Sequence, residues 1–185
     1  MRGFKSVLNT MSKFEQYNIL LKDLPIGTTT KEFILDDAFF QKIDGPEVQK
    51  GSAKATVTIR RKEHIFELLF KLAGTISVPC DRCLDDMEQE IAHEENLLVK
   101  FGNKFSEEDE IVIVSEVEGS INIAWFLYEF IVLNIPIKHV HRPGKCNKMM
   151  ISKLKIHIAY SEGDDDDEDT LFDLNDELEE TDTND

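Results

Sequence analysis

The stretch ATVTIRRKEHIFELLFKLAGTISV, residues 55–78, decides the fold of this chain. Apolar side chains occupy alternate positions on both sides of a polar turn at 61–63. The alternating residues are Ala55, Val57, Ile59, Phe66, Leu68, Phe70, Leu72, Ile76 and Val78. A period of two is typical of a strand that buries one face. The stretch therefore predicts two long strands of an antiparallel sheet, with a bulge or bend at Gly74.

Further strands flank this stretch, and the period then changes to that of a helix. We expect strands at 17–21, 32–35, 87–101 and 111–114, and one helical turn at 38–43. Apolar residues then recur at helical spacing from Ile121 to Ile135, where Ser120 is placed to cap the helix and Pro136 to end it. The aromatic residues of this helix are expected in the core. Residues 149–158 predict a second, short basic helix.

The predicted fold class is therefore α+β. We expect an antiparallel sheet or a partly closed barrel, covered by one main amphipathic helix at 120–134. The domain should span 14–160, between an N-terminal extension at 1–13, with Met11 as a candidate start, and a tail at 161–185. No apolar run reaches the roughly 18 residues that span a bilayer, so no membrane is expected.

The cysteine count indicates a reducing compartment, and we expect the protein in the cytoplasm. There are three cysteines, an odd number, whereas a secreted disulfide framework usually has an even one. Residues 1–13 show no apolar signal core. The thiols should therefore be free or bound to metal.

The acidic charge of the chain is concentrated at its end. The formal net charge is −16, yet residues 161–185 hold 14 acidic residues and no Lys or Arg, and the remaining chain has 21 basic and 23 acidic residues. Such a composition predicts a disordered acidic tail. Four apolar residues interrupt its acids, at spacing that allows one helical face to fold onto a partner: Leu171, Phe172, Leu174 and Leu178.

Two thiols in one turn form the sharpest motif. In Cys80-Asp81-Arg82-Cys83 they are placed to occupy two corners of a zinc tetrahedron, and Cys146 and His141 would complete it, with His139 in reserve. A turn without metal is the competing interpretation. Redox chemistry is the least favoured, because a thioredoxin-like pair should open a helix, whereas this pair joins two strands. The cofactor expected is one structural zinc ion.

A basic segment follows the main helix. It contains no acid, and its six basic residues are Lys138, Arg142, Lys145, Lys148, Lys153 and Lys155. Such a stripe on a nearly neutral domain is suited to RNA phosphates, while a solvated helix face or a partner for the acidic tail explains it equally well. A weaker cluster lies at 50–62.

No catalytic motif is present, so we expect no enzyme and no small-molecule substrate. The sequence has no glycine-rich phosphate loop, no nucleophile elbow, no His-Glu-x-x-His and no dinucleotide fingerprint. The carboxylates at 85–86 and 107–110 fall in predicted turns, where they are normally solvated. Nothing pairs a nucleophile with a base.

These motifs together resemble a known family. A Cys-x-Arg-Cys-Leu turn (80–84) follows a long strand and precedes a helix ending in Asn-Ile-Pro-Ile (134–137), then His141 and Cys146. Over residues 14–154 the chain resembles the YceD family, described as large ribosomal RNA subunit accumulation proteins. Many relatives have a cysteine-rich stretch after the helix, whereas this chain has a histidine and one cysteine there.

The resemblance implies a role in maturing or accumulating large-subunit ribosomal RNA. Our first hypothesis is a non-catalytic ribosome-biogenesis factor that contacts that RNA or a ribosomal protein. The second is a protein-only adaptor or chaperone for a basic ribosomal protein, which would use the acidic tail as an RNA mimic. The third is a thiol oxidoreductase at Cys80 and Cys83.

Overall fold

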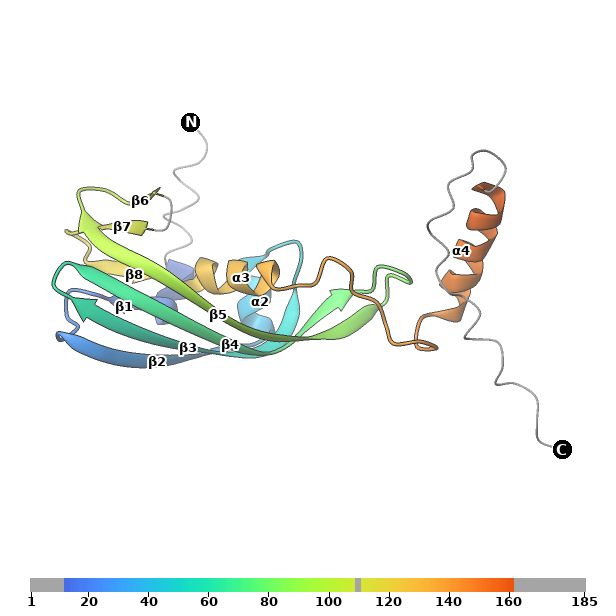
Figure 1. The fold of residues 1–185 in the computed structure, drawn as a ribbon, viewed down its shortest axis with the longest axis horizontal. Helices are drawn as coiled ribbons and strands as arrows, with labels where there is room; N and C mark the ends of the chain where they lie inside the picture. The colour runs from blue at the N-terminus through green and yellow to red at the C-terminus, as the bar shows by residue number, and fades with distance from the viewer. Residues whose placement is uncertain (1–11, 109–110, 162–185) are drawn as a thin grey trace. The chain divides into compact units, whose positions relative to one another are not determined.

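A computed structural model describes residues 12–108 and 111–161 (Figure 1). The predicted N-terminal extension, up to residue 11, and the predicted acidic tail, from residue 162, lie outside the described residues. Among the described residues, no helix combines the length and hydropathy that crossing a membrane requires.

The α+β class is confirmed: the main sheet has six strands, is antiparallel except for one pair, and is open rather than closed into a barrel. In spatial order they are β2 (Gly27–Leu35), β3 (Lys50–Lys62), β4 (Ile65–Pro79), β5 (Asp86–Gly102), β7 (Ile111–Ser115) and β6 (Ser106–Glu108). Neighbouring strands β2, β3 and β4 pair antiparallel. After β5 the chain first forms β6 at the edge of the sheet and then returns as β7 between β6 and β5, so β7 runs parallel to β5 and antiparallel to β6.

A second, smaller sheet has two strands. Its strands are β1 (Asn18–Leu20) and β8 (Ser120–Asn122), which pair antiparallel, and the short helix η1 (Ser12–Tyr17) precedes β1. The strand predicted at 17–21 thus begins one residue later. Residues 106–108, which we expected in a turn, form a strand because they pair with β7.

The alternation in 55–78 is confirmed, since every residue of the predicted inward set is buried. A two-residue loop joins β3 to β4, and its first residue, Glu63, has a φ of 46°, as such tight hairpins require. The expected bulge at Gly74 is absent, because pairing continues through Ala53 and Gly74 without a slip. A Cβ at Gly74 would lie 2.4 Å from the Cα of Ala53, so glycine is needed there for close approach.

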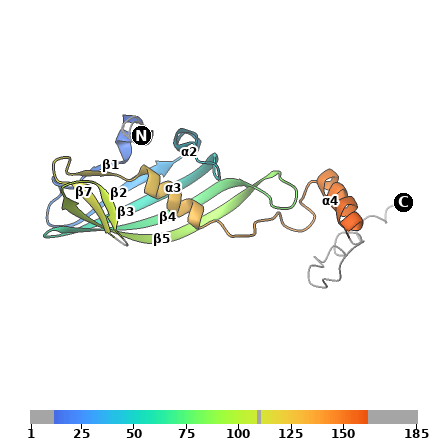
Figure 2. The same cartoon turned by 90° about the horizontal axis from the view of Figure 1, so that it is seen from above.

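Two helices lie on the same face of the sheet (Figures 1 and 2). Helix α2 (Asp37–Ile43) is capped by Asp36, which accepts a hydrogen bond from the Phe39 N–H at 2.9 Å. Helix α3 (Ala124–Leu133) is shorter than predicted. Ser120 does not cap it: the N-cap position is Ile123, which has no side-chain cap, and the side-chain oxygen of Asn122 accepts from the Ala124 N–H at 3.1 Å.

The face of α3 toward the sheet is buried as expected, through Ala124, Leu127, Tyr128 and Ile131. The expectation that the aromatic residues of this helix lie in the core is wrong for Trp125, which is 50% exposed on the other face, where Leu133 and Glu129 are exposed too.

By contacts the chain divides into two compact units. The first holds Met1–Ser77 and Glu88–Ile135, and therefore the two sheets, α2 and α3. The second holds Val78–Met87 and Pro136–Asp185, which include the turn between β4 and β5 and the helix α4 (Lys148–Ser161). The basic helix predicted at 149–158 is therefore present. The bounds of the domain and its two extensions stay a prediction.

Candidate metal centre

The turn between β4 and β5 is a compact knuckle. The N–H of Leu84 donates to the carbonyl of Cys80 at 2.9 Å, and the N–H of Cys80 donates to the carbonyl of Asp85 at 2.9 Å. Leu84 takes a φ of 62°, a left-handed conformation that lets the chain reverse within so few residues. The reversal places Cys80 and Cys83 on the same side of the turn, as the sequence predicted.

The segment after Pro136 is tied to this knuckle. Asp81 donates its N–H to the carbonyl of His139 at 3.0 Å, and its carboxylate accepts the N–H of His139 at 2.7 Å. Farther along, the side-chain amide of Asn147 donates to the Asp85 carboxylate at 3.1 Å. The Asn147 side-chain oxygen also accepts the Met149 N–H at 3.0 Å and so caps α4. The knuckle, the segment and the start of α4 are therefore held together by hydrogen bonds.

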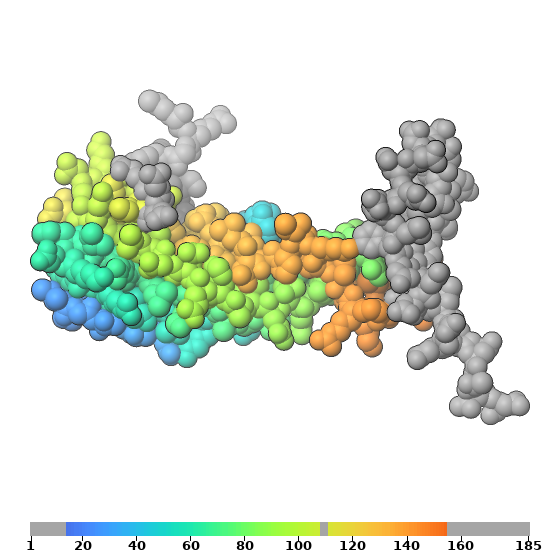
Figure 3. Space-filling model, viewed as in Figure 1, coloured from blue at the N-terminus to red at the C-terminus, as the bar shows by residue number. Residues whose placement is uncertain are grey.

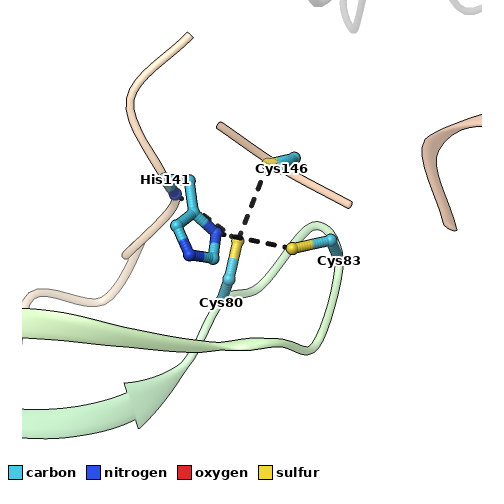
Figure 4. Close-up of side chains that lie close together, drawn as sticks. All are labelled: Cys80, Cys83, His141 and Cys146. Carbon is cyan, nitrogen blue, oxygen red and sulfur yellow. Dashed lines mark hydrogen bonds between the residues drawn. The ribbon is translucent and has the colours of Figure 1, made fainter. Parts of the chain in front are cut away.

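These ties bring all four candidate ligands together (Figure 4). One donor atom from each of Cys80, Cys83, His141 and Cys146 lies within 4.8 Å of the others. The Sγ atoms of Cys80 and Cys146 are 4.0 Å apart, and the Sγ of Cys83 is 3.4 Å from the Nδ1 of His141. Donors around tetrahedral zinc are separated by about 3.8 Å for two sulfurs and about 3.6 Å for sulfur and nitrogen. The four residues thus fit a tetrahedral metal ion.

The reserve ligand His139 is occupied elsewhere. Its Nδ1 lies 3.0 Å from the carbonyl of Pro136, and its Nε2 lies 3.5 Å from the Asp81 carboxylate. His139 therefore orients the knuckle through Asp81, whereas His141 faces the thiols.

Hydrogen bonds and burial shift the pKa values of two of the thiols in opposite directions. Burial raises the pKa of Cys80, but backbone N–H groups of His141, Cys83 and Arg82 outweigh it and lower that pKa to about 6. The N–H groups of Arg82 and His141 lie 3.4 and 3.5 Å from the Cys80 sulfur. Burial and the neighbouring sulfurs of Cys80 and Cys83 raise the pKa of Cys146 to about 11. A thiolate at Cys80 is the form that binds metal.

The cluster is the core of its unit. Cys80, Cys83 and Cys146 are buried together, and the apolar side chains packed against them are only partly buried: Met87, Val140, Met150 and Ile151. So small an apolar cluster contributes little by hydrophobic burial, and small domains of this kind usually need a metal or disulfides. No two sulfurs are bonded, and all three cysteines are free thiols.

Comparison with known protein families gives one match. The family model described as "Large ribosomal RNA subunit accumulation protein YceD" matches residues 68–180. The chain belongs to the YceD family. No curated protein and no solved structure matches it. The range matched by the YceD model runs from β4 onward and includes all four candidate ligands and the whole basic segment.

In this YceD-family chain, the basic segment lies on the surface (orange in Figure 3). Lys138, Arg142, Lys145, Lys148 and Lys153 are exposed, whereas the side chain of Lys155 is outside the described ones. Within the described part of the chain, no carboxylate pairs with Arg142, Lys145, Lys148 or Lys153.

By contrast, two lysines of the weaker cluster at 50–62 are neutralised by neighbouring strands. Lys54 pairs with Glu32 at 2.8 Å, and Lys62 pairs with Glu67 at 2.7 Å.

Sequence reasoning missed that the same unit exposes apolar side chains. Leu84 in the knuckle, Ile137 in the segment and Met149 in α4 are 66%, 103% and 73% exposed. Leu154 lies one helical turn after Met150 and Ile151 and is 37% exposed. Helical spacing on α4 would have revealed Leu154, since it continues the stripe that covers the cysteines.

Proposed function

We propose that this chain is a non-catalytic, cytoplasmic factor that supports accumulation of large-subunit ribosomal RNA, and that its basic segment contacts that RNA. Family membership is the observation that carries the proposal. Four exposed cations of the basic segment support the RNA contact, because Lys and Arg neutralise phosphates and release counterions: Arg142, Lys145, Lys148 and Lys153 pair with no carboxylate among the described residues.

The metal we propose at the four-ligand cluster is one structural zinc ion. Three sulfurs and one imidazole are a soft donor set that suits zinc, and four protein ligands close its coordination. The ion would join the knuckle to the loop that carries Arg142 and Lys145. Its role is therefore to fix where the cations lie, with no part in chemistry.

The composition of this unit favours contact with the RNA backbone over base recognition. Among its described residues, 78–87 and 136–161, the one aromatic ring outside histidine is Tyr160. Stacking platforms for unpaired bases need several exposed aromatic rings. We therefore expect sequence-tolerant binding whose affinity falls steeply with salt, with a slope set by about four to five phosphate contacts.

The second candidate function is an adaptor for a basic ribosomal protein. The observation that favours it is the run of 14 acidic residues in 161–185, which contains no Lys or Arg. A partner with a strongly basic surface would find there the charge of an RNA strand.

The test replaces the cellular copy with a variant that lacks the segment's charge. Lys145, Lys148 and Lys153 are changed to Gln, and a matched control changes Lys54, Lys62 and Lys104 to Gln, which removes the same charge from the first unit. Exposed ion pairs contribute about 0–1 kcal/mol, so the control should fold normally. We expect the ratio of large- to small-subunit ribosomal RNA to fall in the first variant only. An unchanged ratio in a strain where deletion lowers it would contradict the RNA contact.

A further inference from the structure

We infer that the acidic segment at 162–185 docks on its own second unit, which exposes four cations, Arg142, Lys145, Lys148 and Lys153, together with several apolar side chains. The inference goes beyond the proposed function, because it gives the RNA-binding surface an internal competitor. Only the competition with RNA rests on the proposed function; the docking itself does not.

Charge complementarity is the first argument. The four cations named have no carboxylate partner in the described part of the chain, and no acid occurs between Pro136 and Ser161. The segment that follows Ser161 holds 14 acids and no Lys or Arg. Unlike-charged surfaces attract through a range of about 8 Å at physiological salt.

Apolar complementarity is the second, independent argument. The unit exposes Leu84, Ile137 and Met149, and the α4 stripe continues past the cysteines to Leu154. An acidic tail that acted by charge alone would need no apolar residues. This one carries four: Leu171, Phe172, Leu174 and Leu178. The phosphates of an RNA strand pair with the cations but do not bury exposed leucine and methionine side chains. A peptide that is both acidic and apolar can pair with the cations and also bury the apolar side chains.

The covalent connection is the third argument. The segment begins directly after α4 (Lys148–Ser161), and its 24 residues are ample to return along a helix of 14 residues. A short tether gives an effective concentration on the order of millimolar, so even weak intrinsic affinity fills the surface. RNA must therefore displace the segment, which sets a threshold against non-specific polyanions.

The test measures lysine accessibility in the full chain and needs no RNA. Amines are labelled by reductive methylation, and the rate at each lysine is read by mass spectrometry. One variant changes Leu171, Phe172 and Leu174 to Ser and leaves the charge unchanged; a second changes Asp164, Asp165, Asp166 and Asp167 to Asn. Lys104, exposed in the first unit, is the internal control.

Docking predicts that Lys145, Lys148 and Lys153 label at least about threefold faster in both variants, while Lys104 is unchanged, since tethered docking should protect a site on the order of tenfold. In 0.5 M salt the aspartate effect should shrink and the apolar effect should persist. Equal rates in the parent and both variants would overturn the inference. An effect of the aspartate variant alone would overturn the apolar part. Neither result decides whether the cations of the basic segment bind RNA, so the proposed function is tested separately.

Discussion

Replacing one thiol of the cluster distinguishes the stability that a bound metal contributes from the stability of the metal-free fold. Cys83 is 1% exposed, and Ser is close to it in size, so Cys83→Ser leaves almost no cavity. Burying the hydroxyl costs about 1–3 kcal/mol. A closed zinc site at a thousand times its dissociation constant stabilises the folded state by about 4 kcal/mol. With zinc present, we expect Cys83→Ser to lower the free energy of unfolding of the second unit by both amounts. When a chelator has removed the zinc, only the cost of the buried hydroxyl should remain.

Amide hydrogen exchange at the knuckle measures this difference locally. The N–H of Leu84 donates across the turn to the carbonyl of Cys80, and the N–H of Asp81 donates to the carbonyl of His139, so their exchange reports the opening of this unit. Leu84→Ser is the matched control, since it changes the same turn at a residue that is 66% exposed and is no ligand. With zinc, Cys83→Ser should speed exchange by roughly 10⁴ to 10⁵, the factor that corresponds to losing both terms, and Leu84→Ser only slightly. Equal exchange of the parent protein with zinc and with chelator would refute the reasoning.

Three further predictions test the surroundings. In metal-free protein the fold lowers the pKa of Cys80 to about 6 from 9.0, so the stability that its thiolate contributes is complete above pH 9 and is lost as pH falls to about 6; denaturation should show stability rising by at most about 1.4 kcal/mol per pH unit in between, and Cys80→Ser should remove that rise. Asn147→Ala removes the cap of α4 and should cost about 1 kcal/mol with loss of helical circular dichroism, whereas an unchanged spectrum would deny the cap. Gly74→Val places a Cβ against the Cα of Ala53 and should lower the thermal midpoint of the sheet, and an unchanged midpoint would refute the close approach.

The fold could be predicted where burial alone decides it. The two long strands followed from alternation, because one buried face fixes the period of two at 66–78. The parallel pairing of β5 with β7 could not be predicted, since nothing local in Ile111–Ser115 specifies which neighbour it takes. The helix start was misplaced for a similar reason: the pairing of β8 with β1 holds Ser120–Asn122 in a strand, so the helix begins only at Ala124.

The candidate site divides in the same way. The four ligand positions could be chosen from sequence because thiols and imidazoles are few in this chain. The sequence put His141 ahead of His139, but the physical reason for that choice is a structural one. It depends on the Asp81 carboxylate, which lies 3.5 Å from the His139 ring, while the His141 ring faces Cys83 at 3.4 Å. The exposed apolar residues of the second unit were missed because Leu84, Ile137 and Met149 are separated in sequence.

Cross-linking in living cells tests the central claim most directly. Ultraviolet light would join the protein to bound RNA, and mass spectrometry with sequencing would identify the linked peptide and the linked RNA. We predict that the RNA is large-subunit ribosomal RNA and that the linked peptides come from 136–154, the loop and first turns of α4 beside the metal cluster. Linked peptides only from the first unit, or recovery of the protein without ribosomal RNA, would contradict the account.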